Sequence, residues 1–360
     1  MSSVKEAVRT EAKPVSANGP SIRGRREKPK SRKALRIVGR VFAVLGVFLL
    51  AVIVLVVGAV TVICKGPSSS AAEVFVNTVM ETSAAKFVAR IYYSEDEVNA
   101  ILRKYSVIET NEVTQPSLPF DPLDEKEKDE ILVEEVVGST FRGRMMIVRD
   151  PSRVRVAALS VYDGRPGKKV EDFYAESGAI AAINAGGFED IGGVGNGGTP
   201  LGIVIRDSKL LYGSRSSTST VIGFDQNDVL VVGNMTGQQA LDRGLRDAIS
   251  FGPVFIVNGK AVDITGNGGG LNPRTVIGQR ADGAVLLLVI DGRQASSLGA
   301  SYKDCAQIML DYGAVNAANL DGGSSSMMMY NGEILNVSAS LYGSRRLPDA
   351  IIVMPKSDGQ

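Results

Sequence analysis

The chain has 360 residues, enough for one large hydrophobic core with an appendage or for two domains. Its 40 glycines are concentrated after residue 186, which favours tight turns over a helical bundle. The absence of histidine excludes Ser-His-Asp and Cys-His catalysis and His-ligated zinc. The two cysteines, Cys64 and Cys305, exclude a CxxC metal or redox site, and their distant positions argue against a disulfide bridge.

The charges are distributed unevenly along the chain. Residues 1–40 hold twelve Lys or Arg and three Glu, a net charge of +9, so the other 320 residues carry −8. Low apolar content predicts that residues 1–33 are disordered. The basic excess of residues 1–40 indicates contact with a membrane or another polyanion. The remainder is mildly acidic, so we expect no nucleic-acid partner.

An uncharged apolar segment of 23 residues, 41–63, follows the basic tail. At 1.5 Å per residue it spans about 35 Å, enough for the core of a bilayer. We predict an uncleaved signal anchor in the cell membrane, with the tail in the cytoplasm and the rest extracytoplasmic. A buried core helix fits less well because nothing interrupts the run. A cleaved signal peptide lacks an A-x-A site, and a lipoprotein site at Cys64 has Ile63 where a small residue is usual.

Residues 66–130 are predicted to form a helical stalk and a linker. Apolar residues recur at helical spacing between 71 and 107, and Ser94 followed by Glu97 has the pattern of a capping box. Residues 109–130 are rich in Pro and acidic residues, as in a linker or the entry loop of a domain.

From residue 131 the pattern changes to short runs of β-forming residues separated by turn signals such as Asn258-Gly259. Three helices are predicted near 171–180, 238–246 and 301–312. The expected fold of residues 131–356 is therefore α+β and dominated by sheet. The predicted strands are 131–137, 141–149, 153–160, 202–206, 219–224, 228–232, 253–257, 274–279, 284–290, 315–320 and 349–354.

Four clusters rich in Gly, Asn and Asp lie at the ends of these strands or of shorter apolar runs. They are residues 184–190, 272–275, 291–294 and 319–326. Polar groups at strand ends, with glycines that let a ligand approach the backbone, are typical of binding sites. Each cluster alone could be an ordinary turn. Four of them, two with an arginine, favour a site.

Other patterns in the sequence say less about function. Residues 193–198 satisfy G-x-G-x-x-G, but 201–205 reads as a strand where the dinucleotide fingerprint needs a helix. No phosphate-binding P-loop motif is present. We expect residues 192–199 to be either a lid or a simple glycine loop. The run of methionines at 327–329 is predicted to be core or pocket lining.

At these clusters the sequence resembles the phosphodiester glycosidase family, the bacterial relatives of the uncovering enzyme (N-acetylglucosamine-1-phosphodiester alpha-N-acetylglucosaminidase). The resemblance covers about 225 residues in family order, and Asn-Pro-Arg-Thr and Asn-Leu-Asp-Gly-Gly are its specific parts. Ala185 and Ser324 depart from glycines common in the family. The matching pieces are residues 183–188, 252–253, 258–259, 272–275 with Gly278, 291–293 and 316–325.

The resemblance implies hydrolysis of a sugar-1-phosphodiester. Cleavage at the anomeric carbon passes through an oxocarbenium-like state that a carboxylate can stabilise or attack. The leaving phosphate monoester needs little acid assistance, and arginine can hold it. We therefore expect Asp321 and Asp291 as the carboxylate pair and Arg274 on the phosphate. The expected substrate-binding residues are Asn184, Gly186, Gly187, Glu189, Asn272, Thr275, Arg293, Asn319, Gly322, Gly323, Ser324 and Ser325.

Alternatives remain open at this stage. A non-catalytic module that binds phosphorylated glycans would keep Arg274 but would not need Asp321 and Asp291. A transferase of exopolysaccharide assembly would use the same residues with a glycan hydroxyl in place of water. A purely structural envelope protein gives no reason for acids and arginines at strand ends. Asp and Asn oxygens could hold Ca²⁺ or Mg²⁺, but no loop has a recognisable ligand spacing, so we expect no required ion or cofactor.

Overall fold

The computed structural model describes residues 32–116, 120–340 and 343–356, so most of the predicted disordered tail lies outside the described residues. The chain divides into two units, residues 1–59 and 60–360. Helix α1 (Arg32–Lys65) contains the predicted apolar segment. It is long and apolar enough to cross a membrane, features that a signal sequence near an N-terminus shares.

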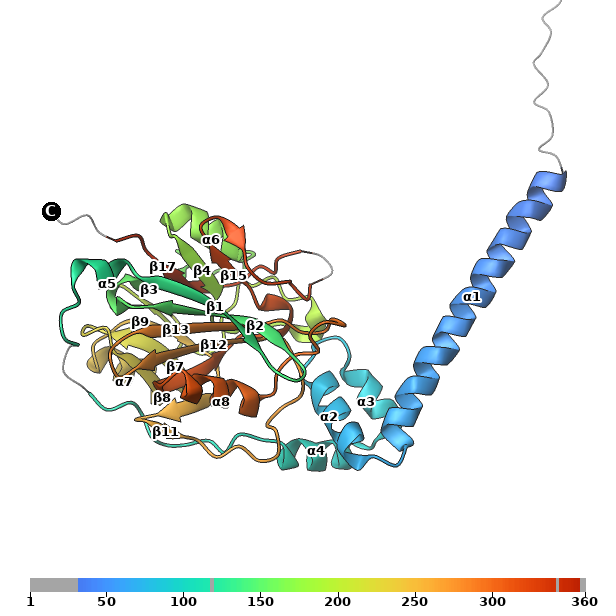
Figure 1. The fold of residues 1–360 in the computed structure, drawn as a ribbon, viewed down its shortest axis with the longest axis horizontal. Helices are drawn as coiled ribbons and strands as arrows, with labels where there is room; N and C mark the ends of the chain where they lie inside the picture. Colours follow the sequence, from blue (N-terminus) through green and yellow to red (C-terminus); the bar gives the residue numbers. More distant parts are fainter. Residues whose placement is uncertain (1–31, 117–119, 341–342, 357–360) are drawn as a thin grey trace, which may run out of the picture. The chain divides into compact units, whose positions relative to one another are not determined.

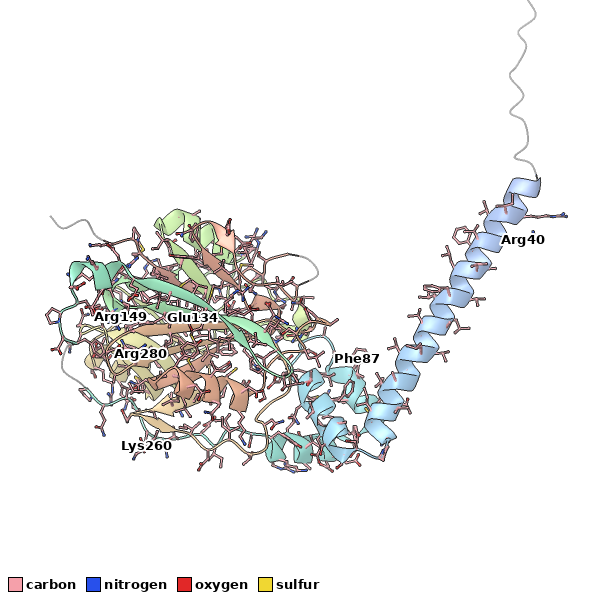
Figure 2. The ribbon with its side chains drawn as sticks, viewed as in Figure 1. Arg40, Phe87, Glu134, Arg149, Lys260 and Arg280 are labelled. Atoms are coloured by element: carbon pink, nitrogen blue, oxygen red, sulfur yellow. The ribbon has the colours of Figure 1, made fainter. Side chains whose placement is uncertain are left out.

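Three short helices form the stalk segment. They are α2 (Ser69–Met80), α3 (Lys86–Tyr92) and α4 (Glu95–Lys104), as Figure 1 shows. Val76, Ala89 and Val98, one from each helix, are buried together. The predicted capping box of α4 is present, because Ser94 and Glu97 exchange hydrogen bonds. The stalk thus has a small apolar core of its own, while Phe87 of α3 points outward (Figure 2).

The remainder is built around three β-sheets, which confirms the α+β expectation. The strand orders are β1-β2-β13-β12-β14-β10-β11, β16-β15-β4-β17-β3 and β6-β5-β9-β7-β8, and all the pairings are antiparallel. The strands of the first sheet are β1 (Ile131–Val137), β2 (Arg142–Val148), β10 (Val254–Val257), β11 (Lys260–Ala261), β12 (Arg274–Arg280), β13 (Val285–Ile290) and β14 (Ala314–Leu320). The second contains β3 (Val154–Ala158), β4 (Ala181–Asn184), β15 (Met328–Tyr330), β16 (Glu333–Ile334) and β17 (Asp349–Val353). The third contains β5 (Val204–Arg206), β6 (Lys209–Tyr212), β7 (Thr218–Asp225), β8 (Leu230–Thr236) and β9 (Leu245–Ser250).

At strand β13 the first sheet is buried on both faces. Its six residues are all apolar and buried, and the side chains alternate between two cores. Leu287 packs in a core shared by all three sheets, whereas Leu288 packs in a second core with helix α8 (Tyr302–Asp311). Helix α6 (Val170–Ser177) covers the second sheet, α7 (Gly237–Asp242) contacts the third, and α5 (Glu125–Asp129) precedes β1 (Figure 1).

The predicted elements differ from the structure mainly around β9. The helix expected near 238–246 ends at Asp242, and β9 begins at Leu245. The charged residues Arg246 and Asp247 disguise this central strand, because they are buried as a pair between β5 and β7. The short strands β6, β11, β15 and β16 were also not predicted. Both cysteines are free and buried.

Candidate active site

The predicted clusters converge because strand ends meet at one edge of the first sheet. Thr275 at the start of β12 pairs with Leu320 at the end of β14, and Arg274 pairs with Ile290 at the end of β13. The second sheet reaches the same place through the end of β4. Asn184 Nδ2 donates to the carbonyl oxygen of Asp321 at 2.5 Å. Antiparallel pairing and one side-chain bond thus bring all four clusters together.

A pocket of about 550 Å³ opens at this meeting point, a size typical of small-molecule sites. It is lined by nine of the predicted site residues and by six residues of the stalk segment. The predicted residues are Asn272, Arg274, Arg293, Asn319, Asp321, Gly322, Gly323, Ser324 and Ser325. The stalk residues are Met80, Glu81, Thr82, Ser83, Ala84 and Lys86, and the rest are Phe188, Asp190, Gly193, Leu201, Phe251, Tyr302 and Arg345.

Asp321 is the carboxyl group at the floor of the pocket. Its backbone N–H donates to Ala185 O at 2.9 Å, which fixes the residue between the two sheets. Burial raises the pKa of the Asp321 carboxyl to about 6, against the lowering effect of Ser325. No donor among the described residues reaches its buried Oδ2. Such a carboxyl changes ionisation near neutral pH and has an oxygen available for a ligand.

Asn319 presents a second acceptor of the same kind. Its Nδ2 donates to Gly252 O at 2.9 Å, which orients the amide. The opposite atom, Oδ1, is buried without a donor among the described residues, although the residue lines the pocket. Buried acceptors without partners are rare in folded proteins. The two oxygens of Asn319 and Asp321 therefore mark a place where a ligand with hydroxyl groups would be held.

Arg293, like Lys86, is a cation of the pocket that lacks a carboxylate partner among the described residues. Its Nη2 donates to Asn272 Oδ1 at 3.0 Å, and its backbone has φ of 59°. Arg293 is an exposed residue, yet partial loss of hydration around its guanidinium, together with the charge of Arg274, lowers the pKa of Arg293. A Cβ on Gly323 would lie 3.1 Å from Arg293 Nη2, so glycine leaves room beside the guanidinium. The remaining donors of Arg293 are suited to an anion.

Arg274 is placed differently from Arg293. Its guanidinium is buried, lies 4.1 Å from the centre of the Tyr302 ring, and donates through Nε to Ala300 O at 3.0 Å. Its Nη2 donates to Gly270 O and to Glu81 Oε2, both at 2.7 Å. The protein itself therefore satisfies most of the donors that the sequence assigned to the substrate phosphate.

Comparison with known proteins shows which family the sequence around this pocket matches. Residues 177–354 match the sequence profile of the family described as phosphodiester glycosidase. The chain carries a phosphodiester glycosidase domain. This domain contains all the pocket residues except those of the stalk segment.

Relatives of the glycosidase domain come from bacteria and animals. Over 169 residues the chain is 31% identical to the SPbeta prophage-derived uncharacterized protein YomE of Bacillus subtilis (strain 168), covering 44% of this chain and 25% of YomE. Over 219 residues it is 26% identical to the N-acetylglucosamine-1-phosphodiester alpha-N-acetylglucosaminidase of Mus musculus, covering 55% of this chain and 41% of that enzyme. The match thus spans between a quarter and two fifths of these relatives.

The fold of the glycosidase domain also resembles a solved structure. The catalytic domain of zebrafish N-acetylglucosamine-1-phosphodiester alpha-N-acetylglucosaminidase has a TM-score of 0.51 and 21% identity to this chain. The superposition covers 63% of this chain and 83% of the zebrafish chain. At this identity the likeness concerns the fold.

Four predicted residues of the glycosidase domain lie behind the pocket. Asn184 Oδ1 accepts from Thr275 Oγ1 at 2.8 Å and from Met327 N at 3.0 Å, so this buried pair supports the loop of Asp321. Gly186 and Gly187 are buried where the chain passes close to Asp349 and Phe251. These four support the site without lining it.

Glu189 and Asp291, two predicted acids of the glycosidase domain, are not among the described residues that line the pocket. Glu189 is exposed. Asp291 is half-buried, and its Oδ1 accepts from Val337 N at 2.9 Å and from Asn336 Nδ2 at 3.4 Å. The structure therefore does not bring Asp291 together with Asp321 in the pocket.

The glycosidase domain contains a second buried acid, Asp349, that the sequence reasoning missed. It begins β17, is fully buried, and accepts from Gly186 N at 2.6 Å through Oδ1. Burial, with the nearby charge of Asp321, raises the pKa of Asp349 to about 7. The available signal was an acid at the head of an otherwise apolar strand, Ala350–Val353.

The glycine loop of the glycosidase domain is fixed by Asp190. This carboxylate accepts from Arg345 Nη2 at 2.9 Å, Gly195 N at 2.7 Å and Ser83 Oγ at 2.9 Å. Although burial opposes it, the hydrogen bond from Arg345 holds the pKa of Asp190 below its usual value. The loop thus forms one side of the pocket and contacts the stalk segment.

A larger cavity, about 690 Å³, lies elsewhere, beside the loops at residues 150–155 and 226–228. Two of its charged lining residues are paired, since Arg155 and Asp228 approach each other within 3.9 Å, and Asp228 also pairs with Arg246. In the same region Arg149 and Arg280, both labelled in Figure 2, donate hydrogen bonds to Asp282 Oδ2. Larger size therefore does not make it the better candidate.

The described residues contain no group of three or more His, Cys, Asp or Glu side chains that could hold a metal ion.

Proposed function

We propose that the protein hydrolyses a sugar-1-phosphodiester of the GlcNAc-1-phosphodiester type in its 550 Å³ pocket. The observation that carries the proposal is the pair of buried acceptors, Asp321 Oδ2 and Asn319 Oδ1, in one pocket with the guanidinium of Arg293, which has no carboxylate partner among the described residues. A sugar offers hydroxyl donors to the first two, and a phosphodiester offers an anion to the third. The glycosidase domain supports the reaction class.

The proposed mechanism assigns the reacting centre to Asp321. The bond from the anomeric carbon to the phosphate oxygen breaks, and its electron pair leaves with the phosphate monoester. Ionised Asp321 stabilises the positive charge on the sugar, as nucleophile or as the base that accepts a proton from the attacking water. Asp349, buried behind it with a raised pKa, retains a proton and so avoids a second negative charge beside Asp321.

The phosphate side of the mechanism belongs to Arg293. Its guanidinium holds the phosphate oxygens with charge-assisted hydrogen bonds. The backbone N–H groups of Gly323 and Ser325 are not available to the phosphate, because they donate to Pro273 O at 2.9 Å and to Gly322 O at 3.1 Å. Arg274, which the sequence assigned to this contact, is not given the phosphate here, because Ala300, Gly270 and Glu81 engage most of its donors.

We place this activity at a cell membrane. The support is the apolar helix α1 together with the basic excess of residues 1–40. By the positive-inside rule, such a tail stays in the cytoplasm and the pocket faces outward. The substrate would then be a cell-envelope glycan or an exopolysaccharide that contains a sugar-1-phosphodiester.

The test is release of free sugar from a panel of α- and β-sugar-1-phosphodiesters, with GlcNAc first, by the full chain in detergent. Release that is lost in Asp321→Asn supports the proposal, and hydrolysis in ¹⁸O water should put the label in the sugar. Label in the phosphate would overturn cleavage at the anomeric carbon. Binding without release would indicate a phosphoglycan-binding module, and release only with an added glycan acceptor would indicate a transferase.

A further inference from the structure

One wall of the pocket comes from outside the glycosidase domain. The turn between α2 and α3 lies nearly a hundred residues before residue 177, where the family match begins. Glu81 in this turn accepts from Asn272 Nδ2 at 2.6 Å and from Arg274 Nη2 at 2.7 Å, both through Oε2. A stalk carboxylate is therefore bonded directly to two residues that line the pocket.

The contact belongs to a close docking of α2 on the loop before β12. Thr78 Oγ1 accepts from Leu271 N at 3.0 Å. The backbones approach so closely that a Cβ on Gly270 would lie 2.3 Å from the Cα of Thr78. Only glycine fits at that distance. Ser83, further along the same turn, donates to Asp190 at 2.9 Å on the other side of the pocket.

Glu81 determines how the two residues it contacts can act. It neutralises the buried charge of Arg274, which would otherwise face the pocket without a carboxylate partner. It also orients the Asn272 amide. With Nδ2 held by Glu81, Asn272 turns Oδ1 toward Arg293 Nη2 at 3.0 Å. Two consecutive hydrogen bonds thus link the stalk carboxylate to the guanidinium proposed to hold phosphate.

We propose that the stalk segment Met80–Lys86 is part of the substrate site and that Glu81 is a positioning residue for the phosphate-binding arginine. Glu81 acts through Asn272 on Arg293 and does not touch the substrate. The pocket has its 550 Å³ with this segment in place, so the segment forms a wall and does not fill the site. The inference rests on the proposed function in one respect, the assignment of phosphate to Arg293.

The experiment compares Glu81→Ala, Glu81→Gln and Glu81→Asp with wild type, all as the full chain in detergent. The expected result is a KM for the sugar phosphodiester that rises about tenfold in Glu81→Ala, with a smaller change in kcat. Affinity for inorganic phosphate, measured by calorimetry, should fall by a similar factor. Glu81→Asp should restore part of both, because it keeps the charge. A merely structural role would lower Tm and leave KM and phosphate affinity unchanged.

Two further variants separate the effect of docking the stalk segment at the pocket from the effect of stalk stability. Glu73→Gln is the matched control, since Glu73 is a stalk carboxylate that bonds to Lys104 and Tyr105, away from the pocket. It should leave KM unchanged. Gly270→Ala forces Thr78 and Glu81 away without altering either residue. It should reproduce the KM of Glu81→Ala, and the double variant should be no worse than either single variant.

Three outcomes with the variants, and one with the wild type, would overturn the inference. KM and phosphate affinity within twofold of wild type in Glu81→Ala would make Glu81 purely structural. A higher rate in that variant would mean that the segment obstructs the site. Equal effects of Glu73→Gln would mean that stalk folding alone matters. A wild-type chain that binds phosphate but releases no sugar would overturn the proposed function, and the phosphate affinities would still decide the role of Glu81. No phosphate binding by wild type would overturn both.

Discussion

Two regions of the molecule bury charged side chains, and they treat them in opposite ways. Around β9, Arg246 pairs with Asp247 and Asp228, and its Nη2 also donates to Val154 O at 3.0 Å. In the pocket, Asp321 keeps a buried oxygen without a donor, and Arg293, which is an exposed residue, has no carboxylate partner among the described residues. Arg246, Asp247 and the Asp321 carboxyl all carry the free-energy cost of taking a charge out of water.

The difference separates a structural cluster from a functional site. A buried cluster that is fully paired stabilises the fold only relative to a broken cluster, and removing one member leaves a stranded charge. A buried group without a partner costs stability in the free protein and is available to a ligand. The two regions should therefore respond to mutation in opposite ways, in activity and in stability.

Asp321→Asn should have the largest effect on activity. It removes the carboxylate from the anomeric centre, and the rate of sugar release should fall by about 10³ or more. Tm should stay the same or rise, because the variant no longer buries an ionisable carboxyl. Sugar release and thermal unfolding measured on the same preparation check both. A large loss of Tm would assign Asp321 to the structural class instead.

Asp247→Asn should lower stability and leave activity unchanged, the converse of Asp321→Asn. It leaves Arg246 with one carboxylate partner in a buried position, and the free energy of unfolding should fall by about 3 kcal/mol. Chemical denaturation measures this loss. The kcat and KM of the folded fraction should match wild type, and a change in either would couple the cluster to the site.

Arg293→Ala should raise KM for the phosphodiester by roughly tenfold to a hundredfold, the usual effect of losing charge-assisted hydrogen bonds. Arg293→Lys should recover part of the loss, since lysine keeps the charge but not the planar pair of donors. Competition by inorganic phosphate gives an independent readout. The matched control is Arg155→Ala in the paired region, which should leave KM unchanged.

The pH dependence of stability should reveal the two acids with raised pKa values. Asp321 and Asp349 have pKa values of about 6 and 7 in the folded chain, above the ordinary value of 3.8. The folded state then binds more protons than the unfolded state between about pH 4 and pH 7, so stability should fall as pH rises through that window. Urea unfolding at several pH values should show the slope, and Asp349→Asn should remove part of it.

Asp291→Asn should have the smallest effect of the series. Its carboxylate accepts from Val337 and Asn336 outside the pocket, so we expect less than about a fivefold change in kcat. The kcat of Asp291→Asn should be measured by steady-state kinetics together with that of Asp349→Asn, so that the two variants are compared directly. A loss near that of Asp321→Asn would restore Asp291 to the catalytic role that the sequence assigned to it.

The sequence predicted the parts of the site that depend on local patterns. The clusters around Asn272, Arg293 and Asp321 were found because each follows or precedes an apolar strand, and antiparallel pairing then brings them together. Glu81 could not be found in this way. Its partners are 191 and 193 residues away, and nothing in the helical pattern of the stalk indicates which loop it meets.

The same distinction, between local sequence patterns and contacts of distant residues, explains which strands were predicted and which were missed. Strands made of apolar residues, such as β13, were predicted within a residue or two because burial on both faces leaves a continuous apolar run. Strand β9 was missed because Arg246 and Asp247 satisfy each other inside the protein, a tertiary arrangement that local propensity does not contain. Asp349 was passed over for a related reason, since its partner is the backbone of Gly186.

The position of β17 in the second sheet has a consequence for the order of synthesis. This strand lies between β3 and β4, although both precede it by more than 160 residues. A ribosome makes every other strand of that sheet before β17, so β3 and β4 wait with unpaired edges while most of the chain emerges. The pocket, which needs Arg345 on one side and Asp349 behind Asp321, is completed at the same late moment. A nascent chain should therefore acquire its ligand-binding site in a single late step.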